Sequence, residues 1–217
     1  MRSDAQLRSD VQAELDWDPA LKSASVGVTA NDGVVTLSGH VASHAQKYAA
    51  ERAAQRVKGV KALAIEITVK LPASDQRTDA DIALAVERGL EWSALVPTDR
   101  VKPLVEDGWV TLNGEVEWEY QRKAAETAVR NLMGVTGVSN LIKMTPKVVP
   151  SDIEKRLHDA LVRQADQEAE RIEIGVSGSQ VNLRGEVHSW AEFNAVQRAA
   201  WAAPGVTSVI NNLVIQD

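Results

Sequence analysis

The sequence predicts an α+β fold made of three tandem modules, each with the element order α-β-β-α-β. The first observation is a repeat: DGVVTLSGHV at 32–41 recurs as DGWVTLNGEV at 107–116 and, more loosely, as SQVNLRGEV at 179–187. Offsets of 75 and 71 residues also align the flanking segments, so the copies fill the chain. The second observation is a hydrophobic period that changes from helical to alternating within each copy. We expect modules 1, 2 and 3 at 1–71, 76–145 and 150–217, joined by proline-bearing segments around Pro72 and between Pro146 and Pro150.

Each module begins with an amphipathic helix, because apolar residues recur four apart at Ile82, Val86 and Leu90. Two alternating stretches follow, and an Asp-Gly pair between them (Asp32-Gly33 in module 1) is typical of a tight antiparallel hairpin. We assign structural turn roles to the repeat's glycines, which are Gly33, Gly39, Gly108, Gly114 and Gly185.

The rest of each module is a second helix and a last strand. The apolar stripe of this helix is mostly alanine, as at Ala49, Ala50 and Ala53, which permits close packing on a sheet. The final apolar stretch follows a Gly-Val pair, and a strand–helix–strand link that ends in a parallel pair is right-handed. The order predicts a three-stranded mixed sheet with two helices on one face.

Composition excludes several classes of protein. The chain has 217 residues, of which 44% are hydrophobic and 25% charged, and it has no cysteine. Disulfides, thiolate nucleophiles, Fe–S clusters and cysteine-type zinc sites are therefore excluded. The formal net charge of -6 disfavours nucleic acid as a partner. No apolar run is long enough to predict a transmembrane segment, and the opening residues lack a secretory signal, so we expect a cytoplasmic protein.

Catalytic and metal-binding motifs do not emerge from the sequence. His40 and His44 are spaced like two metal ligands on one helix, but the repeat places His40 at a strand end and His44 near a helix start. We interpret them as a solvated pair. The sequence also lacks a P-loop, a G-x-G-x-x-G after a strand and a G-x-S-x-G elbow. We expect no enzyme activity, no cofactor and no metal.

The six tryptophans can be sorted by comparing equivalent positions. Trp17 and Trp92 are equivalent, and we expect them to cover Leu21 and Val96 in the loop after the first helix. The other four are predicted to lie off the core of their own module. Trp109 is expected on the open sheet face, Trp118 at a helix-capping position, Trp201 off the alanine stripe, and Trp190 exposed at a helix start.

These off-core residues predict a surface for a membrane interface or a protein partner, because tryptophan is large and amphipathic. Packing between adjacent modules is the alternative explanation. The second helix of module 1 is also locally basic, which suits anionic lipid, although a solvated face opposite the alanine stripe is the favoured explanation. The candidate binding residues are Trp109, Trp118, Tyr120, Trp190, Trp201, Lys47, Arg52, Arg56, Lys58 and Lys61.

The pattern G-x-V-x-L-x-G-x-V, an alanine-rich helix and then G-V-x-x-V resembles the BON domain family. Three segments carry it: 33–41 with 59–60, 108–116 with 134–135, and 181–187 with 205–206. The resemblance implies the same α+β fold and a non-enzymatic bacterial protein of osmotic or envelope stress that binds phospholipid or an envelope-associated partner. It alone would suggest a periplasmic location. A protein-interaction scaffold or chaperone-like protein is the alternative function, and potassium binding is the third.

Overall fold

The computed structural model describes residues 3–22, 24–145, 153–164 and 172–216. The predicted joint between Pro146 and Pro150 lies outside the described residues, as do the side chains of Leu161 and Arg163. The described residues form three modules. The predicted α+β class with three tandem mixed sheets is confirmed.

The element order is the same in every module. Module 1 comprises α1 (Asp4–Trp17), the short 3-10 helix η1 (Pro19–Leu21), β1 (Ser25–Asn31), β2 (Val34–Val41), α2 (His44–Arg56) and β3 (Ala62–Val69). Module 2 comprises α3 (Asp79–Glu91), β4 (Val101–Glu106), β5 (Trp109–Val116), α4 (Glu119–Val129), β6 (Gly137–Asn140) and β7 (Lys143–Met144). Module 3 comprises α5 (Ile153–Gln164), β8 (Ile172–Ser177), β9 (Gln180–Val187), α6 (Trp190–Ala202) and β10 (Ser208–Ile215).

The second strand of each module is the middle strand of its sheet. It pairs antiparallel with the first strand and parallel with the last, as the sequence predicted. Residues of the middle strand that point to the helices are fully buried, and Leu37, Leu112 and Leu183 occupy equivalent positions among them. Each module thus has its own hydrophobic core between the sheet and its two helices, and the other sheet face is left open.

The hairpin turns are fixed from two sides. Asp32 and Gly33 have φ values of 51° and 82°, a left-handed pair that matches the predicted tight turn. The carboxylate of Asp4, the first residue of α1, accepts hydrogen bonds from both turn amides at 3.0 and 3.2 Å. Asp79 does the same in module 2, at 2.9 and 2.8 Å. The first helix is therefore tied to the hairpin independently of core packing.

Three glycines assigned to turns lie elsewhere. Gly39, Gly114 and Gly185 are inside β2, β5 and β9, with φ values of 125°, 135° and 135°. A Cβ atom on Gly39 would collide with the carbonyl oxygen of Ser25 on the neighbouring strand. The turn assignment is wrong for these three. Their positive φ favours glycine, and at Gly39 and Gly114 the backbone of the preceding strand leaves no room for a Cβ atom.

The last strand of module 2 also departs from the prediction of one continuous strand. It is split into β6 and β7, with Leu141 exposed between them. The side chain of Asn140 turns toward α4 and donates hydrogen bonds to the carbonyl oxygen of Arg122 at 2.9 Å and to Glu126 at 3.2 Å.

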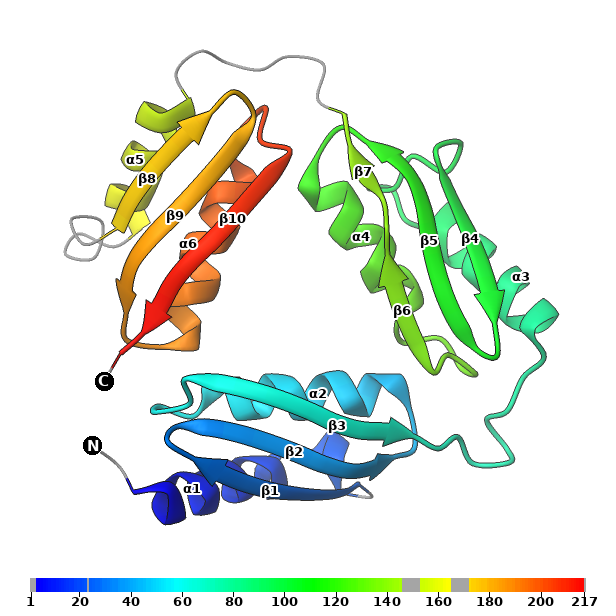
Figure 1. Cartoon of the computed structure of the whole chain (residues 1–217). Coiled ribbons are helices and arrows are strands. Elements are labelled where there is room, and N and C mark those ends of the chain that lie inside the picture. The colour runs from blue at the N-terminus through cyan, green and yellow to red at the C-terminus, as the bar shows by residue number, and fades with distance from the viewer. Residues whose placement is uncertain (1–2, 23, 146–152, 165–171, 217) are drawn as a thin grey trace.

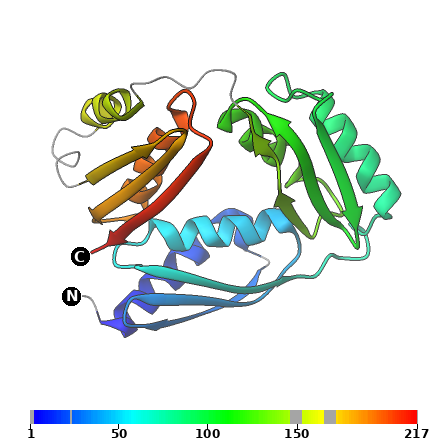
Figure 2. The same ribbon diagram turned by 45° about the horizontal axis from the view of Figure 1, so that its top comes forward.

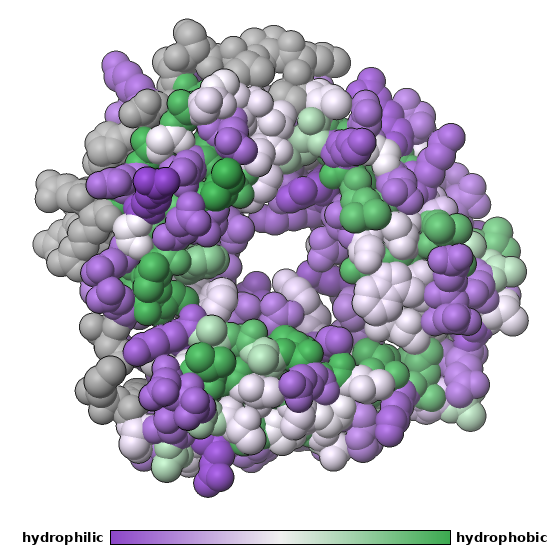
Figure 3. All heavy atoms as spheres, viewed as in Figure 1, coloured by the Kyte–Doolittle hydropathy of each residue, from purple (hydrophilic) through white to green (hydrophobic). Residues whose placement is uncertain are grey.

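The modules are arranged as a ring. All the sheets turn their open face to the same side, and the helices lie behind them (Figures 1 and 2). The second helices α2, α4 and α6 are the inner helices of the ring, and α6 contacts both of the others. The space-filling view shows an opening at the centre, bordered mainly by hydrophilic residues (Figure 3). The ring therefore has a sheet side and a helix side.

Candidate binding surfaces

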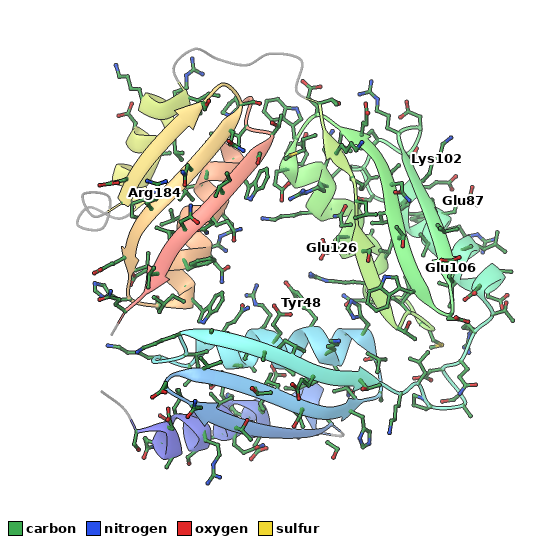
Figure 4. All side chains as sticks on the ribbon, viewed as in Figure 1. Tyr48, Glu87, Lys102, Glu106, Glu126 and Arg184 are labelled. Atoms are coloured by element: carbon green, nitrogen blue, oxygen red, sulfur yellow. The ribbon has the colours of Figure 1, made fainter. Side chains whose placement is uncertain are left out.

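The inner helices meet head to tail, with the start of one beside the end of another. At the junction of modules 1 and 2, the guanidinium carbon of Arg130, which caps the end of α4, lies 4.0 Å from the centroid of the Tyr48 ring on α2. Figure 4 shows Tyr48 projecting from α2 toward the central opening of the ring. This distance is typical of a cation–π contact.

His44 begins α2 at the same junction. Burial lowers the pKa of His44 below its ordinary value, and the positive charges of Lys47 and Arg130 lower it further, while Glu126 opposes the change. The Nδ1 atom of His44 and the Nε atom of Arg130 are both buried without a hydrogen-bond partner. The junction is thus built around a neutral histidine beside two cations.

The junction of modules 2 and 3 joins the start of α4 to the end of α6. The guanidinium carbon of Arg122 lies 4.9 Å from the centroid of the Trp201 ring. The same guanidinium is held by Glu119, with an Nε to Oε2 distance of 2.7 Å, and Glu119 is only 7% exposed. Trp201 therefore serves a contact between modules, which was one of the two environments expected for it.

Trp190 closes the ring between modules 3 and 1. Its half-buried side chain packs against the core of module 3 and against the core of module 1. The ring of Phe193 lies 5.2 Å from it, centroid to centroid. The expectation that Trp190 is exposed is wrong, because a neighbouring module covers it.

Trp109 lies on the open sheet face, as predicted. Its register neighbours are Glu106 on β4 and Gly137 on β6. The indole lies directly against Gly137, where a Cβ atom would collide with it, and its Nε1 donates a hydrogen bond to Ser139 at 2.9 Å. The side chain remains 46% exposed.

The other candidate residues of module 2, Trp118 and Tyr120, lie in two kinds of environment. Trp118 is half-buried at the N-cap of α4, whereas Tyr120 is exposed. No side chain caps α4, and Gln121 supplies only the reciprocal half of a capping box, because its Oε1 accepts hydrogen bonds from the backbone amides of Glu117 and Trp118 at 3.0 Å each. No contact joins Trp118 or Tyr120 to Trp109 in the interactions found among the described residues.

The basic candidates on and after α2 are dispersed. Arg56 forms ion pairs with Glu14 at 2.7 Å and Asp18 at 3.5 Å. The methylenes of Lys61 pack over the hairpin glycine of module 1, and Lys47 is half-buried beside the first junction. Arg52 and Lys58 are exposed, and so is the ion-paired Arg56.

The most exposed tryptophans are the two that were expected to be structural. Trp17 is 81% exposed and Trp92 is 89% exposed, so neither covers Leu21 or Val96, which are nevertheless buried. The helical period already indicates that Trp17 is exposed. Trp17 comes two residues after the buried Leu15, which turns it roughly 200° away from the core stripe.

Further apolar side chains accompany Trp92. Leu84, Arg88 and Trp92 are four residues apart and share the outer face of α3 and its end. Leu84 is 53% exposed, and Leu95, in the turn after the helix, is 56% exposed. This outer face of module 2 combines large apolar side chains with charges, which is typical of a binding surface.

Neither a metal site nor a membrane-spanning helix is found in the described part of the chain. No group of three or more histidine or acidic side chains within it is placed to hold a metal ion. None of its helices has the length and hydrophobicity needed to cross a membrane.

Comparison with known proteins gives consistent matches. The family model for the BON domain matches residues 3–70, 78–146 and 151–217. The chain is 33% identical over 148 residues to the osmotically-inducible protein Y of Escherichia coli (strain K12), a match that covers 64% of this chain and 72% of that protein.

Among solved structures, the chain is similar to CdsD, a structural protein of the type III secretion system of Chlamydia trachomatis. The identity is 16% and the TM-score 0.27, over 97% of this chain and 92% of that one. A C-terminal domain of CdsD matches with the same identity and TM-score over the full length of both chains. Neither likeness informs the function.

Proposed function

Because the chain belongs to the BON domain family, we propose that it is a non-catalytic binding protein of osmotic stress that docks on phospholipid membranes through its helix side. The observation that carries this proposal is the exposure of Trp17 and Trp92, at 81% and 89%, at equivalent positions of modules 1 and 2. Tryptophan is enriched at membrane interfaces, where its ring leaves water and its N–H group keeps a polar partner.

The ring geometry supports a shared docking plane. The two tryptophans end α1 and cap α3, and these helices both lie behind the sheets in Figure 1. Equivalent residues of modules 1 and 2 are thus carried on the same side of the ring. A flat surface that meets the helix side would approach both helix ends at once, and two attachments are stronger than one.

Vesicle co-sedimentation tests this proposal. Vesicles of equal parts phosphatidylcholine and phosphatidylglycerol should retain the wild-type protein, and the double variant Trp17→Ala/Trp92→Ala should lose about ten- to a hundredfold in affinity, because each large side chain no longer leaves water. Trp109→Ala on the opposite side is the matched control. Unchanged binding of the double variant, with its fold verified by circular dichroism, would refute docking through these residues.

A second candidate function has its own observation. Five exposed apolar side chains lie on the open sheet faces, which turn to one side: Val34, Leu104, Trp109, Ile210 and Val214. A protein-interaction scaffold would use this sheet side. Loss of vesicle binding in Trp109→Ala, with the Trp17/Trp92 variant unaffected, would move the site to the sheet side.

A further inference from the structure

The outer sheet edge of module 1 lacks the residues that protect the equivalent edges of modules 2 and 3. In Figure 1, β1, β4 and β8 are the outermost strands of their sheets, whereas the last strand of each module borders the central opening. β4 contains Lys102 and Pro103, and β8 contains Glu173. β1, with the sequence SVGVTAN, has neither a charge nor a proline. Charges and prolines are the usual protection of an edge strand against pairing with another chain.

The repeat places this difference at the middle of the edge. Gly27 is equivalent to Lys102 and Glu173, and Val28 is equivalent to Pro103. Both charged side chains are exposed, and Lys102 lies at the outer edge of module 2 (Figure 4), where it would meet an incoming strand. Residues 1–71 carry nine basic and eight acidic side chains, so two copies of module 1 do not repel each other.

The register identifies the free backbone groups of β1. Asn31 and Val34 close the two-residue turn, so this pair and every second pair along the strands exchange hydrogen bonds within the sheet. The residues between them, Val26, Val28 and Ala30, therefore direct their N–H and C=O groups to the outer edge. Among the described residues, no backbone hydrogen bond from a turn or loop reaches these three, and β1 is the last strand of its sheet.

A second copy of the same strand satisfies these groups. When two β1 strands pair antiparallel with Val28 opposite itself, Val26 lies opposite Ala30 on the helix side, and Gly27 lies opposite Thr29 on the open face. From this self-complementarity we infer that the protein forms a two-fold symmetric dimer, in which two β1 strands join the three-stranded sheets of module 1 into one six-stranded sheet. The protected edges of modules 2 and 3 limit the assembly to two copies.

Sedimentation equilibrium of the full chain tests the dimer. We expect a dissociation constant in the micromolar range, because two paired edge strands bury an area at the low end of specific interfaces. Gly27→Lys gives module 1 the residue of module 2, and its Cβ atom has room, since the nearest atom is the Oγ of Ser38 at 3.7 Å. It should weaken dimerisation at least about tenfold, because the two new charges lie diagonally across the paired strands.

Gly175→Lys is the matched control. Gly175 lies on β8 at the outer edge of module 3, where a Cβ atom also has room, and the substitution adds the same charge. It should leave the dissociation constant unchanged, and circular dichroism verifies the fold of both variants. A monomer at every concentration overturns the inference. So does a dimer that Gly27→Lys does not weaken, or an equal loss in the two variants.

Pyrene labels test the register. The chain has no cysteine, so Thr29→Cys and Ser25→Cys each create one labelling site at an exposed position of β1. In the proposed dimer the two copies of position 29 are diagonal neighbours about 7–8 Å apart, whereas the two copies of position 25 are about 20 Å apart. Only the label at position 29 should give excimer fluorescence. Excimer emission from both labels, or from neither in a sample that sediments as a dimer, overturns pairing around Val28.

Discussion

The junction between modules 3 and 1 and the junction between modules 1 and 2 use equivalent helix positions with opposite chemistry. The first residue of α6 is Trp190, which packs on two hydrophobic cores, whereas the first residue of α2 is His44, which lies beside the cation of Arg130. The repeat determines where the modules touch. The residue at each equivalent position determines which kind of interaction holds the two modules together. One contact depends on buried apolar area, and the other on protonation and charge.

The junction between modules 2 and 3 lies between these extremes. Its Arg122 is neutralised by the buried Glu119 and stacks on the apolar ring of Trp201. The three junctions therefore form a series from apolar to charged. Substitutions can rank them, since each junction can be altered at an equivalent helix position.

The largest effect is expected at the apolar junction. Trp190→Ala removes packing from two cores, and we expect the free energy of unfolding to fall by about 2–3 kcal/mol, below the range for fully buried tryptophan because Trp190 is only half-buried. Urea denaturation measures the change. Trp109→Ala, on the open sheet face, is the control and should cost less than half as much. Equal losses in the two variants would mean that Trp190 does not join the modules.

The middle junction should respond next. Glu119→Ala leaves the half-buried guanidinium of Arg122 without its carboxylate, and a loss of about 1–3 kcal/mol in the free energy of unfolding is expected. Urea denaturation of Glu115→Ala, which removes an exposed carboxylate from β5, provides the comparison. If both variants lose the same stability, the Glu119–Arg122 pair does not support the junction.

The fold could be predicted because its determinants are local and repeated. Alternation and the Asp-Gly pairs located the hairpins, and Asp32 and Gly33 adopt the left-handed conformations that such a turn needs. The turn assignment of Gly39 failed because the close approach of Ser25 is a contact between strands, which the spacing of glycines does not reveal.

The candidate site was less predictable, for two physical reasons. Comparison of equivalent positions shows that Trp190 is unusual, but the neighbour that covers it belongs to another module and has no signature in the repeat. The prediction that Trp17 covers Leu21 is wrong for a different reason. Its angle from Leu15 around the helix turns it to solvent, and Leu21 is buried without its cover.

A smaller effect tests the cation–π contact of the charged junction. Tyr48→Leu should lower the free energy of unfolding by about 1 kcal/mol, because Arg130 loses the aromatic face it stacks on. Tyr48→Phe keeps that face and should stay close to wild type in the same thermal or urea measurement. A Phe variant as unstable as the Leu variant would assign the effect to the hydroxyl group instead.

The smallest effect is the pH dependence of the same junction. Because the pKa of His44 is lowered in the folded protein, its contribution to stability is complete above its ordinary value of 6.5. That contribution is lost as the pH falls through 6.5 toward the lowered value, since protonation adds a charge beside Lys47 and Arg130 that Glu126 only partly offsets. The drop in melting temperature from pH 7.5 to pH 5 should therefore be larger for wild type than for His44→Gln.

The difference between these two drops isolates the effect of His44, because every other titrating group is common to the two proteins. The same difference should persist in a Trp190→Ala background, since the apolar junction has no part in the titration of His44. A difference that disappears in that background would show that the two junctions open together. In that case the series from apolar to charged contacts would describe one cooperative ring and not three separate junctions.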